Sequence, residues 1–362
     1  MMQRTKSNNS LSVQVKKHAN SSSKQKAEYD GNECYISTGS TLLDLALTGT
    51  RVRGGGIPTG IAVEIFGDSS AGKTVLMCEI AGAIQRCGGD VIFNDPEARL
   101  DQEFAKLFDF SISDKTIKQP DTIAEVFEEF ITWKPEGKGP HAIIADSIAA
   151  LCTENEMKPQ KGSKTTDDEE GTKKGYDGAK RANDFSIGFR RCIRMIKDKN
   201  YLMVFSNQIR DTMSTLPFAK KTKATGGHAP KFYASLRLEI TKQKVLKNEK
   251  IIHGKAHKES YGILSKVDII KSSVDKGYRS ANIYIIDGYG IDDVRANLIY
   301  LKQNSAHKEY SIDGIEMLGS SINAAIKGIE SAGLEFDLKE SVIDLWEEIQ
   351  EQFKTDRKPK VR

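Results

Sequence analysis

Residues 62–74 read AVEIFGDSSAGKT, an apolar run followed by a glycine-rich turn and a Lys-Thr pair. The last eight letters, from Gly67 to Thr74, fill every fixed position of G-x-x-x-x-G-K-[ST], and a helical pattern follows them. Because a strand before this motif and a helix after it are the context in which it binds phosphate, we predict a phosphate-binding loop here. The alternative is a Gly/Ser turn before an ordinary helix, and the complete motif argues against it.

The loop supplies the groups that hold a nucleoside triphosphate and its magnesium ion. Lys73 is expected to reach the β- and γ-phosphates of ATP, and the Thr74 hydroxyl to bind Mg²⁺. Backbone N–H groups of the loop and of the following helix start surround the phosphate oxygens. The residues predicted to bind the nucleotide are therefore Gly67, Asp68, Ser69, Ser70, Ala71, Gly72, Lys73 and Thr74.

Two carboxylates follow neighbouring apolar runs. Asp146 ends the run in HAIIADS, where a second ligand for Mg²⁺ is expected. Glu97 follows VIFND and Pro96, where a carboxylate could polarise an attacking water. An acid at a helix start is the alternative for Glu97, and residue type does not decide between the two.

The apolar runs alternate with helical patterns, which predicts an α/β fold with a mainly parallel, twisted sheet flanked by helices. Strands are expected at 62–66, 91–94, 142–146 and 202–207, and helices at 73–86 and 123–133. Further β-type segments cover 232–241, 265–271 and 281–286, and the Lys-rich stretch 243–260 between the first two predicts a hairpin or a mobile excursion. Helical patterns at 322–332 and 338–353 predict a small C-terminal α/β domain.

Composition bounds the class of protein. The chain has 362 residues, of which 38% are hydrophobic, and no run approaches the roughly 18 apolar residues of a membrane span. Its first ten residues lack the apolar core of a signal peptide, so a cytoplasmic location and no membrane partner are expected. Five scattered cysteines predict reduced thiols rather than a zinc site or disulfides.

Basic charge is concentrated in one region. The formal net charge is +4, but residues 210–258 hold 12 Lys or Arg against 3 Asp or Glu, which gives +9 there and −5 elsewhere. Such a patch favours a polyanion, because each neutralised phosphate releases counterions. A merely solvated basic face is the alternative.

Several motifs then resemble the RecA family in order and spacing, over residues 36–291. They read ISTGSTLLDLAL, VEIFGDSSAGKT, FNDPEARLD, IIADSIAAL, SNQIR and TGGHAPKFYAS. The resemblance implies a RecA-type P-loop ATPase core over 35–287, an N-terminal polymerisation arm over 1–34 and a C-terminal domain with a basic tail over 288–362. It also implies a DNA-dependent ATPase that forms filaments on single-stranded DNA and exchanges strands with duplex DNA in recombination, repair and the SOS response.

The resemblance also implies roles for single residues of the nucleotide site. Glu97 is then the general base, Gln208 senses the γ-phosphate, and Lys271 reaches the ATP of an adjacent subunit. Asp101 and Phe104 fall where the family contacts adenine. Without the resemblance, the residues themselves favour a strand-end amide for Gln208 and a core aromatic for Phe104.

DNA contacts are implied in two segments, 154–180 and 211–228. The residues expected to contact DNA are Arg190, Arg210, Phe218, Gly226 and Gly227. A flexible turn is the alternative for the second segment taken by itself.

This sequence departs from the family pattern at three places. The first DNA segment is longer than the family's usual form and contains DDEE at 167–170. Ser273 stands where the family has a second lysine at the subunit interface, a charge that Lys276 could supply instead. The C-terminal tail is basic, whereas the family's tail is acidic. Two other functions therefore stay open: a hexameric, helicase-like motor of the same superfamily, and a DNA-binding scaffold without turnover.

Overall fold

The structure is a computed structural model that describes residues 34–157, 167–211, 222–224, 228–305, 309–312, 315–319, 321–354 and 357. The described residues form two compact units, one up to Asp293 and one from Val294 onward. Leu11, Val13 and Val15 of the expected N-terminal arm, and the end of the basic tail, lie outside the described residues.

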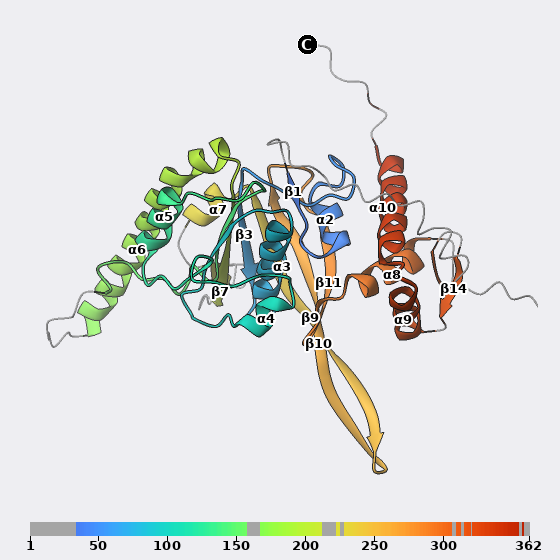
Figure 1. The fold of residues 1–362 in the computed structure, drawn as a ribbon. Helices are drawn as coiled ribbons and strands as arrows, with labels where there is room; N and C mark the ends of the chain where they lie inside the picture. Colours follow the sequence, from blue (N-terminus) through green and yellow to red (C-terminus); the bar gives the residue numbers. More distant parts are fainter. Residues whose placement is uncertain are drawn as a thin grey trace, which may run out of the picture. The chain divides into compact units, whose positions relative to one another are not determined.

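A twisted sheet forms the centre of the first unit, with strands in the order β12-β11-β10-β9-β3-β7-β6-β4-β5 (Figure 1). The strands of this path are β3 (Ala62–Gly67), β4 (Val91–Asn94), β5 (Ile117–Lys118), β6 (Ala142–Ala145), β7 (Leu202–Asp211), β9 (Leu236–Ile252), β10 (Lys255–Ser272), β11 (Ser280–Ile286) and β12 (Gly290–Ile291). All pairs from β9 to β5 are parallel, and those from β9 to β12 are antiparallel. The mainly parallel α/β fold is confirmed.

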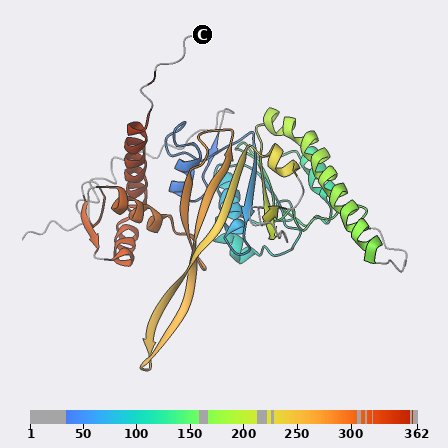
Figure 2. The ribbon, with the colours of Figure 1, turned by 180° about the vertical axis from the view of Figure 1, so that it is seen from behind.

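Helices cover both faces of this sheet, as the two opposite views show (Figures 1 and 2). On one face, α2 (Thr41–Thr48) and α3 (Lys73–Arg86) pack with Val63 and Ile65 of β3. On the other face, α5 (Ile123–Thr132) and α6 (Asp167–Asp198) pack with Met203 and Phe205 of β7. The alternation along the strands thus buries both faces, as a parallel sheet requires.

Local sequence signals set several helix ends. Helix α5 begins at a capping box, in which the Thr122 hydroxyl accepts from the Glu125 N–H and the Glu125 carboxylate accepts from the Thr122 N–H. Helix α4 (Gln102–Lys106) begins at Asp101, whose carboxylate accepts from the Phe104 N–H. Short pieces complete the unit: β1 (Tyr35–Ile36), β2 (Ile57–Pro58), β8 (Thr222–Ala224) and α7 (Ala229–Tyr233).

Strands β9 and β10 continue far beyond the sheet as a two-stranded arm, defined here as residues 241–260 (Figure 1). The pairing of β3 with β9 ends at Ile240, whereas β9 and β10 stay paired to Ile252 and Lys255. His253 and Gly254 turn the chain with φ of 51° and 74°, as a two-residue hairpin demands. Of the two alternatives for 243–260, the hairpin is confirmed. The expected strands 232–241 and 265–271 extend into it, because an arm solvated on both faces gives no apolar alternation that would mark its strands in the sequence.

Two further expectations need correction. Phe232 belongs to α7, which begins beside Pro230, and not to a strand. The first segment, expected as a loop over 154–180, is helical from Asp167 onward as the start of α6. Phe185 and Phe189 anchor α6 in the core. Residues 167–184 contain no proline, so the helix can extend toward its N-terminus from that anchor.

The second unit combines helices with a small hairpin. It contains α8 (Asp293–Asn304, from Val294 onward), β13 (Tyr310–Ile312), β14 (Ile315–Gly319), α9 (Ile322–Ala332) and α10 (Glu335–Gln352). Helix α9 matches the expected 322–332, and it ends at Gly333 with φ of 65°, in the left-handed region that favours glycine. Among the described residues, none of the helices combines the length and apolar character needed to cross a membrane.

Candidate nucleotide-binding site

A cavity of about 390 Å³ opens at the carboxyl ends of the parallel strands. This is the edge of an open α/β sheet where ligands bind. Its lining comes from parts of the chain that are far apart in sequence: Ser69, Ser70, Gly72, Lys73, Thr74, Val75, Phe93, Asp95, Glu97, Arg99, Leu100, Asp146, Ser147, Gln208, Ile263, Ile285 and Asp287. The cavity thus brings together eight of the residues that the sequence singled out: Ser69, Ser70, Gly72, Lys73, Thr74, Glu97, Asp146 and Gln208.

Two glycines shape the loop from β3 to α3. Gly67 has φ of 148° and Gly72 has φ of 102°, both in the region that other residues rarely adopt. A Cβ atom at Gly67 would lie 2.0 Å from the Ile240 carbonyl oxygen, and one at Gly72 would lie 2.2 Å from Ile285 Cδ1. Glycine is therefore required at both positions, and Gly72, Lys73 and Thr74 at the start of α3 line the cavity.

Lys73 is buried at the first turn of α3, with its ammonium group turned back onto the loop. Its Nζ atom donates to the carbonyl oxygens of Gly67 at 3.0 Å and Asp68 at 2.6 Å. Burial lowers the pKa of Lys73, and the carboxylates of Asp146, Asp68 and Glu97 oppose that shift. The Lys73 ammonium group is therefore held by two loop carbonyls and lies within the field of three carboxylates.

Thr74 and Asp146, the two residues predicted to bind magnesium, are hydrogen-bonded to each other. The Thr74 hydroxyl donates to Asp146 Oδ2 at 2.5 Å, and the Ser206 hydroxyl on β7 donates to Asp146 Oδ1. The oxygen donors fit Mg²⁺, which protein sites bind through one or two carboxylates, hydroxyls, phosphates and water. Within the described part of the chain, no separate cluster of His, Cys, Asp or Glu could hold a metal.

Glu97 lines the cavity from the segment that follows β4. Its carboxylate pairs with Arg99 at 2.8 Å, and its side chain is 21% exposed. The turn between them is fixed by Asp95, whose side chain accepts from the Leu100 N–H and whose carbonyl accepts from the Ala98 N–H. Glu97 is therefore positioned over the cavity and does not cap a helix, since the nearby helix α4 is capped by Asp101.

Asp101 and Phe104 do not line this cavity. Asp101 caps α4, and the half-buried Phe104 ring packs edge-on against Phe108 at a centroid distance of 5.1 Å. Their contact with adenine stays a prediction.

Sequence reasoning missed the part of the lining that comes from β10 and β11. Ile263 and Ile285 lie on these strands and Asp287 follows β11. Asp287 carried a usable signal, since YIID is an apolar run that ends in an acid, like the run that ends at Asp146. Ile263 and Ile285 carried none, because only the folded sheet brings them here.

Lys271 lies outside the cavity, at the end of β10. Its Nζ atom donates to the carbonyl oxygens of Lys231 at 3.1 Å and Phe232 at 2.9 Å, in α7. Burial and the charge of Arg237 lower the pKa of Lys271, and Glu64 opposes this.

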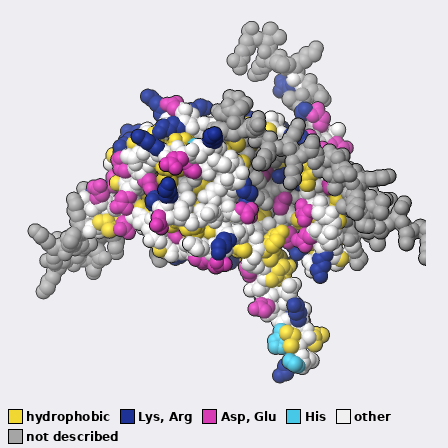
Figure 3. Space-filling model, viewed as in Figure 1, with side chains coloured by type: hydrophobic (Ala, Val, Ile, Leu, Met, Phe, Trp, Pro, Cys, Tyr) yellow, Lys and Arg dark blue, Asp and Glu magenta, His cyan; other side chains and the backbone are white. Residues whose placement is uncertain are grey.

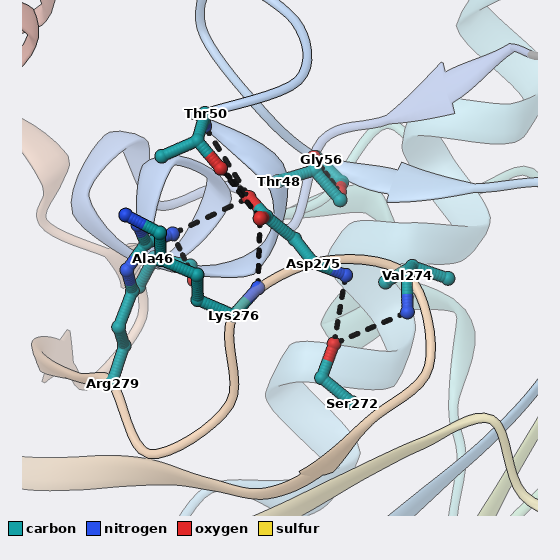
Figure 4. A network of polar contacts seen from close by, with 9 residues as sticks. All are labelled: Ala46, Thr48, Thr50, Gly56, Ser272, Val274, Asp275, Lys276 and Arg279. Atoms are coloured by element: carbon teal, nitrogen blue, oxygen red, sulfur yellow. Dashed lines mark hydrogen bonds and ion pairs between the residues drawn. The ribbon is translucent and has the colours of Figure 1, made fainter. Parts of the chain in front are cut away.

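The loop after Lys271 is fixed by a polar network around Asp275 (Figure 4). The Asp275 carboxylate accepts from the Thr50 hydroxyl, from the Lys276 N–H at 2.7 Å and from Arg279 at 3.4 Å. The Ser272 hydroxyl oxygen accepts from the N–H groups of Val274 and Asp275. Ser273, at the position of the missing lysine, donates its N–H to the Ser235 carbonyl. The backbone around Lys276 is therefore well defined.

Three of the predicted DNA contacts, Phe218, Gly226 and Gly227, lie outside the described residues. The backbone of Arg210 belongs to β7, but its side chain is not described. Arg190 is exposed on α6 and donates to the Ser186 carbonyl of its own helix. Its neighbour Arg191 pairs with Glu128 of α5, and Arg181 donates to the carbonyls of Ile148 and Ala149. Arg181 and Arg191 thus bind other parts of the chain, whereas the hydrogen bond of Arg190 stays within α6.

Comparisons with known proteins agree with this geometry. The family model described as RecA N-terminal domain matches residues 13–292. Protein RecA of Methylococcus capsulatus is 33% identical over 256 residues, which cover 71% of this chain and 66% of that protein. Protein RecA of Gloeobacter violaceus is 32% identical over 259 residues, 72% of this chain and 63% of that protein. Protein RecA of Rickettsia massiliae is 34% identical over 256 residues, 71% of this chain and 67% of that protein. The match thus spans just under two thirds of the length of the first two relatives.

Proposed function

The chain belongs to the RecA family, and from that premise we propose that it is a DNA-dependent ATPase that forms filaments on single-stranded DNA and exchanges strands with homologous duplex DNA. One observation carries the proposal: Lys73, Thr74, Asp146, Glu97 and Gln208 meet at one cavity at the carboxyl ends of the strands. Phosphoryl transfer needs this combination of a cation, a magnesium pair, a carboxylate and a γ-phosphate contact.

The chain's own residues divide the work of hydrolysis. Lys73 and the N–H groups at the start of α3 bind the phosphates and neutralise the charge that develops on them. Thr74 and Asp146 would hold Mg²⁺, which when bound draws charge from the β- and γ-phosphate oxygens. Glu97, held by Arg99, accepts a proton from the attacking water.

Gln208 connects this chemistry to the DNA segment that follows it. It lines the cavity near the carboxyl end of β7, which continues as far as Asp211, where the second predicted DNA segment begins. A contact between Gln208 and the γ-phosphate would favour one arrangement of that segment, and hydrolysis would release it. The proposal extends to Lys271, which would leave the α7 carbonyls and reach the nucleotide of an adjacent protomer.

DNA binding is supported by charge. The excess of +9 over residues 210–258 favours a phosphate backbone, and contacts to the backbone leave the bases free to pair. Arg190, Arg210, Phe218, Gly226 and Gly227 are the proposed contacts.

Electron microscopy of the protein with single-stranded DNA, Mg²⁺ and a non-hydrolysable ATP analogue tests the assembly, and strand exchange with homologous duplex DNA tests the reaction. We expect extended filaments that require nucleotide. Closed rings would favour the motor, and DNA binding without phosphate release would favour the scaffold.

Two variants separate the roles within the site. Lys73→Ala is expected to lose nucleotide binding and filaments together. Glu97→Gln has nearly the same size as the parent side chain and is expected to keep nucleotide-dependent filaments while hydrolysis falls by about 10²–10⁴-fold. Normal hydrolysis by Glu97→Gln would remove Glu97 as the base.

A further inference from the structure

A row of polar side chains crosses the middle of the sheet on the face opposite α3. Glu64 of β3 pairs in register with Arg237 of β9, which in turn pairs with Lys271 of β10. The neighbours Val63 and Ile65 belong to the core under α3, so Glu64 points to the other face. These three residues are called the charged row below.

A bulge places Lys271 in this row. Val267 and Ile269 point into the core under α3, and strict alternation would send Lys271 the same way. The register of β10 against β9 shifts between Ile269 and Lys271, so Ile269 opposes Leu238 but Lys271 opposes Arg237. Such a bulge re-aims one side chain, and here it brings a second cation next to Arg237.

Glu64 is the centre of the row. Its side chain is wholly buried, with one carboxylate oxygen accepting from Asn207 Nδ2 at 3.1 Å and the other accepting from Arg237 Nε. The Arg237 guanidinium also lies over the Phe66 ring, 4.4 Å from its centroid. A buried carboxylate is tolerated only with such partners, so Glu64 fixes the positions of both Asn207 and Arg237.

The row is attached to both ends of the second predicted DNA segment. Asn207 immediately precedes Gln208, which lines the nucleotide cavity and leads into residues 211–228. At the other end, α7 follows that segment, and its carbonyls at Lys231 and Phe232 accept from Lys271. Glu64 is therefore connected to the entry of the segment through Asn207. On the exit side it binds Arg237, whose neighbour in register, Lys271, donates to the carbonyls of α7.

We propose that Glu64 is a positioning residue that, through Asn207 and Arg237, couples the state of the nucleotide cavity to α7 and Lys271 at the exit of the DNA segment. The inference rests on the proposed function, since it assigns the coupling between ATP hydrolysis and DNA binding to named side chains. Without the Glu64 charge, one amide oxygen has to serve both Asn207 and Arg237, and the partly buried Arg237 guanidinium stands beside Lys271 without a counter-ion. The two ends of the segment then no longer share a charged anchor.

Three variants of the full chain test this: Glu64→Gln, Arg237→Met and the two together. Phosphate release is measured with and without single-stranded DNA, nucleotide binding with a fluorescent ATP analogue, and stability by urea unfolding. Glu64→Gln is expected to bind nucleotide normally and to lose DNA stimulation about 10-fold, within the usual range of coupling between sites. Glu348→Gln, at an exposed position of α10 outside the basic region, is the matched control and is expected to keep full stimulation.

The double variant separates coupling from folding. Removing both buried charges is expected to restore the stability lost in Glu64→Gln, because no unpaired ion remains, while DNA stimulation stays lost. Full stimulation in the double variant would overturn the proposal, and so would a double variant that does not fold, because the pair would then be a structural requirement. Absence of DNA-stimulated hydrolysis in the unmodified protein would instead refute the proposed function.

Discussion

Glu79 of α3 predicts a pH dependence of stability that a single substitution should remove. Its carboxylate lies against the turn at Gly39 and against Gly290, and accepts a hydrogen bond from the backbone of Ile291. Burial raises the pKa of Glu79 from 4.5 to about 7, with Asp293 and Asp109 adding to the rise and Arg86 opposing it. Glu79 therefore changes its charge near neutral pH in the folded protein.

The magnitude follows from the difference between the folded and the ordinary pKa. A rise from 4.5 to about 7 corresponds to about 3 kcal/mol at roughly 1.4 kcal/mol per pH unit. Between these two values the folded chain binds more protons than the unfolded chain, so the free energy of unfolding falls as pH rises. The stabilising contribution of the protonated form is complete below about pH 4.5 and is lost as pH passes through 7.

Glu79→Gln replaces the acid with a neutral group of the same size. Urea unfolding at pH 5 and at pH 8 is expected to give similar stabilities for the variant and the parent at pH 5, and a variant more stable by about 1–3 kcal/mol at pH 8. Glu103→Gln, on the exposed face of α4, is the control and should leave the pH profile unchanged. Parallel profiles for the parent and Glu79→Gln would refute the reasoning.

Three other substitutions test the local structure by urea unfolding. Asp275→Ala leaves Arg279 without its ion pair in the network of Figure 4 and is expected to lower the free energy of unfolding by about 2 kcal/mol; an unchanged midpoint would contradict this. Gly67→Ala places a Cβ 2.0 Å from a carbonyl oxygen and should lower the free energy of unfolding far more than the control Gly88→Ala. At Gly88 φ is also positive, but nothing lies within 4 Å of the added Cβ, so equal effects of the two substitutions would exclude the steric argument. Asp101→Ala removes the cap of α4 and should cost about 1 kcal/mol, with full stability arguing against the cap.

The residues that the sequence singled out and that the fold brings to the cavity depend on short-range patterns. The phosphate-binding loop is a contiguous motif, and Asp146 follows from the rule that parallel strands carry their chemistry at the carboxyl ends. Both the strand before the loop and the helix after it could be predicted, because a buried apolar run and a 3.6-residue period are visible without a partner.

The residues that the sequence did not identify depend on long-range pairing. Ile285 and Asp287 join the cavity only because β11 lies at the far side of β10, and the direction of Lys271 depends on one bulge. The charged row could not be predicted either, since Glu64 and Arg237 are 173 residues apart. Strand order and register are properties of the folded sheet, and local propensity does not encode them.

The arm formed by β9 and β10 gives the protein a convenient attachment point. Figure 3 shows His, Lys and hydrophobic side chains at its tip, and a Cβ at Gly254 would meet nothing within 4 Å. The tip pairs only with itself and lies on the order of 40 Å along β9 from the last contact with β3, at about 3.3 Å per residue. A short epitope or a dye-labelled cysteine inserted between His253 and Gly254 would therefore leave the sheet and the cavity undisturbed. Such a label could report on assembly at a site that takes no part in nucleotide hydrolysis.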